Sequence, residues 1–455
     1  MKTRMNFKDE FYQKLKLLVL PIAIQNFMLA LVSATDAIML GWIDQTSLSA
    51  VSLAGQVQFV LSLFISGIAA GAGIMAAQYW GKRDAASIEK VIPIALRTNL
   101  LFSGLFTILA GFCPEILMRI FTNDAALVAS GSQYLRAVAL SYVLCGISQV
   151  YLILLKNTGH AAVSSRISST AVVLNIILNA ILIYGLCGAP ALGIRGAAYA
   201  TVAARVVELI WAYLETKKPE RVRILWNRLF SSAGKILSED FWRYTLPVLA
   251  ASLVWGIAYV LYSVIMGHMG SDAVAANSIT SIAKSLLSCL IRGVSGDAGV
   301  LIGNLLGANE LEKAREYGGR LSHLSIAIGI VTGGLLMLIS PAIVHFAPLS
   351  DTAAEYLQYM LLFCGLNLMA QSVNTTVLDG IFCAGGDAKF DMQGNIGAMW
   401  CFSVPLGFLA AFWLKLPVMV VYCIVNLDEI VKLPAVYHHY KKYIWVRNIT
   451  RDVED

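Results

Sequence analysis

The sequence predicts an all-α polytopic membrane protein with twelve transmembrane helices, arranged as two parallel six-helix repeats that form two lobes around a central cavity. Its 455 residues are 58% hydrophobic and only 14% charged, whereas soluble globular domains carry about 25% charged residues. The apolar residues fall in runs that reach the roughly 20 residues a helix needs to cross a bilayer. Pro and Gly residues also recur at a fixed offset, which indicates that the membrane unit is repeated.

The apolar runs are predicted as helices because only helices and closed barrels satisfy every backbone group in lipid. They lack the period-two alternation of barrel strands. The predicted spans cover residues 15–40, 51–78, 91–112, 133–155, 167–184, 194–214, 244–267, 279–305, 321–346, 356–383, 395–412 and 417–437.

Six spans lie on each side of a long polar connection. The predicted parts are an N-terminal lobe at 1–214, a cytoplasmic linker at 215–243, a C-terminal lobe at 244–440 and a cytoplasmic tail at 441–455. Lys and Arg concentrate in both tails, in the linker and in the loops on the same side of the membrane. Positive charge favours the cytoplasm, so we expect a multi-pass protein of the inner (plasma) membrane with both termini cytoplasmic.

The repeat is visible in the pairs Pro21/Pro247, Gly41/Gly267 and Gly81/Gly307, each separated by 226 positions. Each half has an even number of spans, so the two halves run through the membrane in the same direction. Parallel repeats of this kind are related by an axis along the membrane normal, with the binding cavity between them.

The first span contains a carboxylate, Asp36, and its copy at 243–267 contains none. A charge at the centre of a membrane helix costs about 2.5 kcal/mol or more, so such residues face a bundle interior or a water-filled cavity. Asp36 is therefore a candidate to hold a proton or, when ionised, to coordinate Na⁺. The alternative is an interfacial Asp near the outer end of the span.

Several function classes lack their signatures. The eight cysteines form no C-x-x-C motif, the six histidines have no metal-ligand spacing, and there is no phosphate-binding loop, nucleophile elbow or H-E-x-x-H. We therefore expect a transporter rather than an enzyme, driven by an ion gradient, with no cofactor beyond the coupling ion, H⁺ or Na⁺.

Nucleic acid is not expected as a partner, because the basic residues lie in short loops and tails. The expected partners are small amphipathic substrates and the bilayer, and the protein is expected to be a monomer.

The order and spacing of the motifs resemble the multidrug and toxic compound extrusion (MATE) transporters of the MOP flippase superfamily. The resemblance covers essentially the whole chain and rests on these segments: LP…MLG with Asp36, AAQYWGKRD, KNTGH, LNIILN, GIRGAAYAT, LIGNLLGANELEKA, AGGDAK and LDEIVKLP. It implies export of amphipathic, often cationic, compounds in exchange for Na⁺ or H⁺ by alternating access.

The resemblance also implies a cation-coupling site in the N-terminal lobe, formed by Asp36, Asn175, Asn179 and Thr201. Asn175 and Asn179 are one helical turn apart, so their side chains share a face. Many relatives carry Asp at the position of Asn179, and its loss is expected to weaken Na⁺ binding relative to proton chemistry or to leave the site to Asp36 alone. The alternative is hydrogen bonding between helices.

Four residues are candidates for the substrate cavity: Trp255, Lys284, Arg292 and Asp297. Trp255 stands near the position where one branch of the family has an acid, and it could stack on a cationic ligand or pack against lipid or helix. Lys284 and Arg292 are eight residues apart and near one face. They could meet an anionic substrate group or form a neutralised network with Asp297 and Asp379.

The leading hypothesis is a cation-coupled multidrug antiporter, in which ion and substrate favour different states. An exporter or flippase of lipid-linked or other amphipathic anions is the first alternative, suggested by Lys284 and Arg292. A lipid-modifying membrane enzyme is the second, but no catalytic cluster supports it. Two i,i+3 pairs, Arg205–Glu208 and Glu429–Lys432, are predicted as structural ion pairs.

Overall fold

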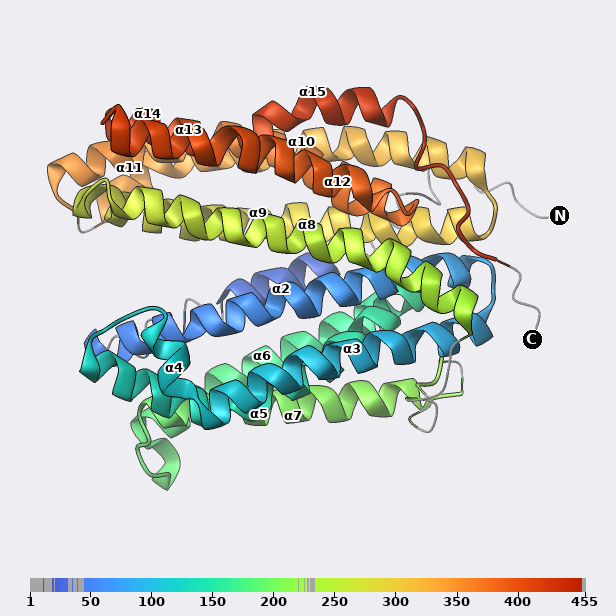
Figure 1. The fold of residues 1–455 in the computed structure, drawn as a ribbon, viewed down its shortest axis with the longest axis horizontal. Coiled ribbons are helices and arrows are strands. Elements are labelled where there is room, and N and C mark those ends of the chain that lie inside the picture. The colour runs from blue at the N-terminus through green and yellow to red at the C-terminus, as the bar shows by residue number, and fades with distance from the viewer. Residues whose placement is uncertain are drawn as a thin grey trace. The chain divides into compact units, whose positions relative to one another are not determined.

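A computed structural model describes residues 11, 19, 21–31, 35, 39, 45–219, 221–224, 226, 229, 234–347 and 349–451. Every regular element among these residues is a helix (Figure 1). The predicted all-α membrane fold is confirmed: nine described segments are long and apolar enough to cross a membrane. One of them, Ala125–Tyr184, is 60 residues long and contains two predicted spans. Pro21–Leu31 is a shorter apolar helix within the first predicted span.

The helices of the first half after Pro21–Leu31 are α2 (Gln45–Gly81), α3 (Ala85–Phe112), α4 (Pro114–Arg119), α5 (Ala125–Leu155), the π-turn η1 (Lys156–His160), α6 (Ala161–Tyr184), the 3₁₀ turn η2 (Leu186–Gly188) and α7 (Ile194–Thr216). Gly159 separates α5 from α6 because its φ of +81° lies in the left-handed region that favours glycine.

The helices of the second half are α8 (Lys235–Gly267), α9 (Ser271–Gly307), α10 (Leu311–Phe346), α11 (Asp351–Thr375), η4 (Thr376–Phe382), α12 (Ala388–Asn395), η5 (Ile396–Ser403), α13 (Val404–Phe408), η6 (Leu409–Trp413), α14 (Val418–Val425) and α15 (Asp428–Tyr440). Segments η4, η5 and η6 are π-helical. Gly386, which lies 227 positions after Gly159 and so close to the repeat offset of 226, also has a positive φ, at +72°. The two halves therefore turn at equivalent glycines.

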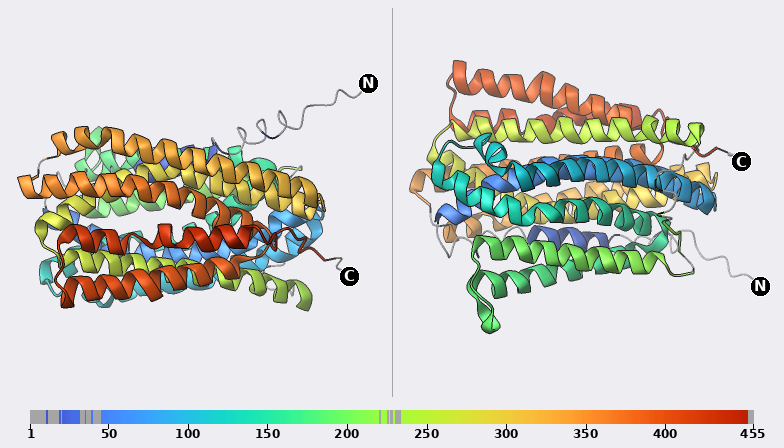
Figure 2. Two further views of the ribbon diagram at one scale, coloured as in Figure 1. Left: turned by 90° about the horizontal axis from the view of Figure 1, so that it is seen from above. Right: turned by 60° about the horizontal axis from the view of Figure 1, so that its bottom comes forward.

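The chain divides into two compact units. The first consists mainly of Phe27–Leu249, and the second consists of Ala250–Asp452 together with Met1–Asn26. Within each unit the long helices lie side by side along a common direction (Figure 1, Figure 2). Phe11 lies in the interior of the second unit: it is 1% exposed, and its ring lies edge-on to that of Tyr317, with the ring centroids 4.9 Å apart.

Small residues allow the helices of the first unit to approach closely. A Cβ atom at Gly71 would lie 2.7 Å from the Cα of Thr245, and one at Gly67 would lie 2.9 Å from the Cα of Leu249. Gly67 and Gly71 therefore have the close-packing role expected of small residues in membrane helices.

The segment after α15 packs back onto the second unit. Trp445 is fully buried, at 0% exposure. The Arg447 guanidinium donates to the carbonyl oxygens of Gly385 and Gly386, at 2.7 and 2.6 Å. The segment thus covers the turn between η4 and α12.

Candidate functional site

Three of the four predicted cation-site residues are joined by hydrogen bonds in the first unit. The amide nitrogen of Asn179 donates to Oδ1 of Asn175 at 3.2 Å, and the amide nitrogen of Asn175 donates to Oγ1 of Thr201 at 3.3 Å. Asn175 and Asn179 are 6% and 0% exposed. The spacing of one turn on α6 aligns the two amides, and α7 supplies the hydroxyl of the half-buried Thr201, so the three side chains form a polar cluster inside apolar helices.

Asp36 lies outside the described residues, so its contacts with this cluster are not part of the structure. A nearby position of the same predicted span is described: the Tyr184 hydroxyl, at the end of α6, donates to the backbone oxygen of Met39 at 2.7 Å. The first span at Met39 is therefore bonded to the helix that carries both asparagines.

The predicted Arg205–Glu208 pair forms as expected. Both carboxylate oxygens of Glu208 accept from Arg205 Nη1 at 2.9 Å, and Oε1 also accepts from Ser148 Oγ at 2.6 Å. Glu208 is 2% exposed. A buried carboxylate needs this many donors to offset the loss of water, so the contacts account for its burial without a ligand.

The residues predicted for the substrate cavity have different neighbours in the second unit. Trp255 stacks on Tyr259, with ring centroids 5.6 Å apart and an interplanar angle of 16°. Lys284 Nζ donates to Oδ1 of Asn367 at 3.0 Å. Arg292 is exposed, whereas Asp297, five residues later on α9, is 0% exposed.

The second unit also contains a buried network that the sequence indicates only through the Glu429–Lys432 pair. That pair forms, with Lys432 Nζ 3.1 Å from Oε1 of Glu429. The same ammonium donates to Oδ1 of Asn395 at 3.1 Å and lies 3.6 Å from Oδ2 of Asp428. Asn395 in turn donates to Asp391 at 3.1 Å.

Two further residues extend this network. The Asn374 amide donates to the backbone oxygen of Glu429 at 2.6 Å and to its Oε2 at 2.8 Å. Asp379, on η4, has Asp391, Glu429, Lys432 and Arg292 within electrostatic range. The i,i+4 spacing of Asp391 and Asn395 was the available sequence signal, but the predicted span began at 395 and left Asp391 in a loop.

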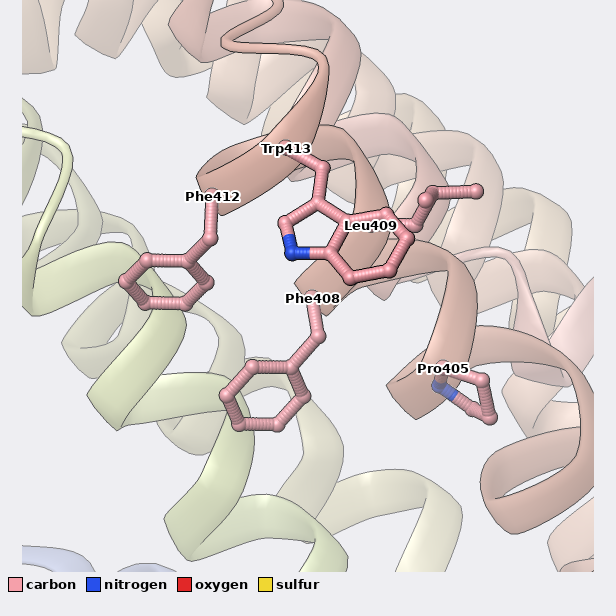
Figure 3. A pocket seen from close by; sticks show the side chains of 5 residues that line it. All are labelled: Pro405, Phe408, Leu409, Phe412 and Trp413. Carbon is pink, nitrogen blue, oxygen red and sulfur yellow. The ribbon is translucent and has the colours of Figure 1, made fainter.

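An apolar hollow of about 480 Å³ lies elsewhere in the second unit, at α13 and η6 (Figure 3). Its lining consists of Pro405, Phe408, Leu409, Phe412 and Trp413. Trp413 is 84% exposed. None of these lining side chains is charged.

Comparison with known proteins identifies one family. The MatE family model matches residues 21–181 and 247–409, one match in each half of the chain. The two matches begin at Pro21 and Pro247, the first pair of the predicted repeat.

Similar curated proteins are matched along nearly their full length. The "probable multidrug resistance protein YoeA" of Bacillus subtilis (strain 168) is 21% identical over 99% of this chain and 98% of its own length. The "probable multidrug resistance protein NorM" of Agrobacterium fabrum is 24% identical over 84% of this chain and 83% of its own.

Solved structures share the fold. A MOP superfamily transporter from Pyrococcus furiosus Vc1 superposes with a TM-score of 0.85 at 20% identity, covering 95% of both chains. An outward-facing multidrug resistance MATE family transporter of the same superfamily also gives a TM-score of 0.85 at 20% identity, with 95% of both chains covered.

Proposed function

Since this chain belongs to the MatE family of transporters, we propose that it is a cation-coupled multidrug efflux antiporter that exports amphipathic, often cationic, compounds. H⁺ and Na⁺ are the candidate coupling ions. The observation that carries the proposal is the Asn175–Asn179–Thr201 cluster. Polar side chains in apolar membrane helices are costly and are kept where they bind or pair, and oxygen atoms are the ligands that hard cations require.

Coupling requires that ion and substrate prefer different conformations of the transporter. An ion bound at Asp36 and the cluster would favour one state, and a substrate would favour the other. By linkage, each ligand then lowers the affinity for the other by the same factor. The ion gradient supplies the free energy of export through this exchange.

The test is efflux from everted vesicles with Na⁺ and pH gradients imposed separately, comparing the unmodified protein with Asp36→Asn. We expect the variant to fold but to lose gradient-driven efflux, and the gradient that drives the unmodified protein identifies the ion. A variant in which the exposed Asp351 becomes Asn is the control for loss of a carboxylate. Undiminished efflux by Asp36→Asn would contradict the proposal.

Export of amphipathic anions is the second candidate, and the exposure of Arg292 favours it. An accessible guanidinium can bind a carboxylate or phosphate bidentately. Competition for efflux between a cationic dye and a lipid-linked anion separates the two functions. Inhibition by the anion that disappears in Arg292→Gln would favour the second.

We also propose that both termini face the cytoplasm of the plasma membrane. The concentration of Lys and Arg in the tails and in the linker supports this orientation. The test labels single cysteines introduced at residue 2 or residue 441, in a background with the eight native cysteines replaced, using an impermeant thiol reagent on intact cells. The expected result is no labelling until the membrane is opened.

A further inference from the structure

The twelfth span, predicted as one helix over 417–437, is divided into α14 and α15 inside the second unit. The Asn367 amide stabilises the break by donating to the backbone oxygen of Asn426 at 2.6 Å. The break places Asp428 and Glu429 in the first turn of α15, where the helix dipole favours negative charge. Interrupted helices in membrane proteins are typical of ion-binding positions, because they bring side chains and free backbone groups together.

The ammonium group of Lys432 meets three oxygen atoms beyond this break. Its Nζ donates to Oε1 of Glu429 and to Oδ1 of Asn395, both at 3.1 Å, and lies 3.6 Å from Oδ2 of Asp428. The side chains of Lys432, Glu429 and Asp428 are 5%, 12% and 8% exposed. Both acids belong to α15, whereas Asn395 ends α12. Oxygen atoms from two helices therefore converge on one buried cation.

Two of these oxygen ligands are oriented by further buried side chains. Asn374 donates to Oε2 of Glu429 at 2.8 Å, which leaves Oε1 for the ammonium. Asn395 donates to Oδ1 of Asp391 at 3.1 Å, which turns its own Oδ1 toward Lys432. Asn374 and Asp391 are 1% and 6% exposed. Outer hydrogen bonds that fix the ligands in this way are a general feature of ion-binding sites.

The i,i+3 spacing of Glu429 and Lys432 does not by itself explain the arrangement. Glu310 and Lys313 have the same spacing, and Lys313 Nζ lies 3.3 Å from Oε2 of Glu310. The side chains of Lys313 and Glu310 are 22% and 49% exposed, so water solvates both charges, and exposed pairs contribute little to stability. Around Lys432 that water is replaced by an amide from another helix and by a second carboxylate.

We propose that these oxygen atoms form a monovalent-cation site and that the ammonium of Lys432 fills it as a tethered counter-ion. A lysine ammonium is a compact point charge, and carboxylate and amide oxygens are the ligands that hard cations require. Because the cation is covalently attached, no ion from solution is needed at this site. In the antiport mechanism proposed above, on which this consequence rests, the ion gradient does not load this site of the second unit.

Removal of the ammonium would leave two carboxylates buried without a cation. Breaking a buried ion pair is strongly destabilising, because the remaining charge has lost both water and its partner. Lys432→Ala also vacates the volume of the lysine stem. A small monovalent cation from solution can then enter and meet the same oxygen atoms, whereas a bulky one cannot.

The experiment follows thermal unfolding of purified Lys432→Ala, without substrate or gradient, in the chlorides of Na⁺, methylammonium and choline at constant ionic strength. Choline is the comparison, because its trimethylated nitrogen is bulky and donates no hydrogen bond. The parent and all variants carry Asp36→Asn, so that no response to Na⁺ comes from that acid. Lys313→Ala, which breaks a pair of the same spacing, is the matched control.

We expect Lys432→Ala in choline to unfold about 5 °C or more below the parent, and most of this loss to be restored by methylammonium or Na⁺. Lys313→Ala should unfold within about 2 °C of the parent in all three salts. A loss in Lys432→Ala no larger than that of the control, or an equal loss in all three salts, would overturn the proposal. A gain from Na⁺ as large in the parent as in Lys432→Ala would also overturn it.

A second variant decides the question if Lys432→Ala does not fold. Lys432→Met keeps a side chain of similar length without the charge, and its stability should rise in Na⁺. Adding Glu429→Gln to Lys432→Met removes a carboxylate and should diminish that response; an undiminished response would contradict the site.

Failure of this inference is separate from failure of the proposed function. Thermal unfolding is measured without transport, so a protein that exports nothing would still show rescue of Lys432→Ala by small cations. Conversely, export that depends on Asp36 would remain established if Lys432→Ala showed no rescue.

Discussion

The contribution of an ion pair to folding depends on how much water its side chains lose. Glu208 and Glu115 both pair with an arginine, but Glu208 is 2% exposed in its side chain and Glu115 is 46% exposed. Replacing Glu208 by Gln should destabilise the protein by about 3–5 kcal/mol, because Arg205 loses its partner in a buried setting. Glu115→Gln, the control, should cost at most about 1 kcal/mol.

Thermal unfolding in detergent, followed by size-exclusion chromatography after heating, measures both effects. A Glu208→Gln variant as stable as Glu115→Gln would show that the Arg205–Glu208–Ser148 contacts do not support the first unit.

Asn179 is the fully buried amide of the Asn175–Asn179–Thr201 cluster. An Asn179→Asp variant places a carboxylate next to Asn175. In the unmodified protein the amide nitrogen of Asn179 lies 3.2 Å from Oδ1 of Asn175. Ion affinity rises with the charge of the ligand set, so we expect apparent Na⁺ affinity to increase by about tenfold or more. Na⁺-dependent efflux in vesicles measures the change. Asn175→Asp is the comparison, and an unchanged Na⁺ response in Asn179→Asp would argue that the cluster does not contact the ion.

At the scale of residues, sequence reasoning found one cluster and missed much of another. The pairing of Asn175 and Asn179 was predictable because a one-turn spacing on a helix places side chains together, and Thr201 was predicted from the resemblance to MATE transporters. The contact of Asn374 was not predictable, because its partner Glu429 comes from α15, 55 positions away. Such contacts depend on how helices pack, and the periodicity of a single helix carries no information about them.

At the scale of elements, two adjacent glycines of α10 give a direct test of helix packing. A Cβ at Gly333 would lie 2.3 Å from the backbone oxygen of Gly365 on α11, whereas one at Gly334 would meet nothing within 4 Å. Gly333→Ala should therefore destabilise the protein by about 1–3 kcal/mol through overpacking. Gly334→Ala should be neutral or stabilising by up to about 1 kcal/mol, since Ala favours helix.

Both variants replace glycine by alanine, and the two positions are neighbours in α10. Their thermal stabilities, measured side by side, check the close crossing of α10 and α11. Equal stabilities would mean that these helices are farther apart than the structure indicates.

The helices were predictable where the local sequence alone determines them. Apolar runs gave the spans, and the matched Pro and Gly residues gave the repeat, with Gly159 and Gly386 both at positive φ. The break in the twelfth span was not predictable, because residues 425–428 contain neither Pro nor Gly. It is held by the Asn367 side chain from α11, which is a tertiary contact.

At the scale of the whole molecule, the segment after α15 is part of the second unit's core. Trp445 is 0% exposed, whereas Trp413 is 84% exposed. Trp445→Ala should cost about 3–5 kcal/mol through the cavity it leaves, and Trp413→Ala, the control, should change stability by about 0.5 kcal/mol or less. Limited proteolysis at the lysines and arginines after α15, together with thermal unfolding, distinguishes the two variants. Equal behaviour would show that the segment adds no stability.

The burial of Phe11 against Tyr317 has a consequence for attempts to divide the protein. If the gene were split between α7 and α8, the upstream fragment would contain residues that belong to the interior of the second unit, including Phe11 and Ala23. The downstream fragment alone would expose the apolar faces of α9 and α10 that those residues cover. Co-expressed fragments should reassemble less efficiently when the upstream one lacks its first 26 residues, because the second unit then loses the contacts of Phe11 and Ala23.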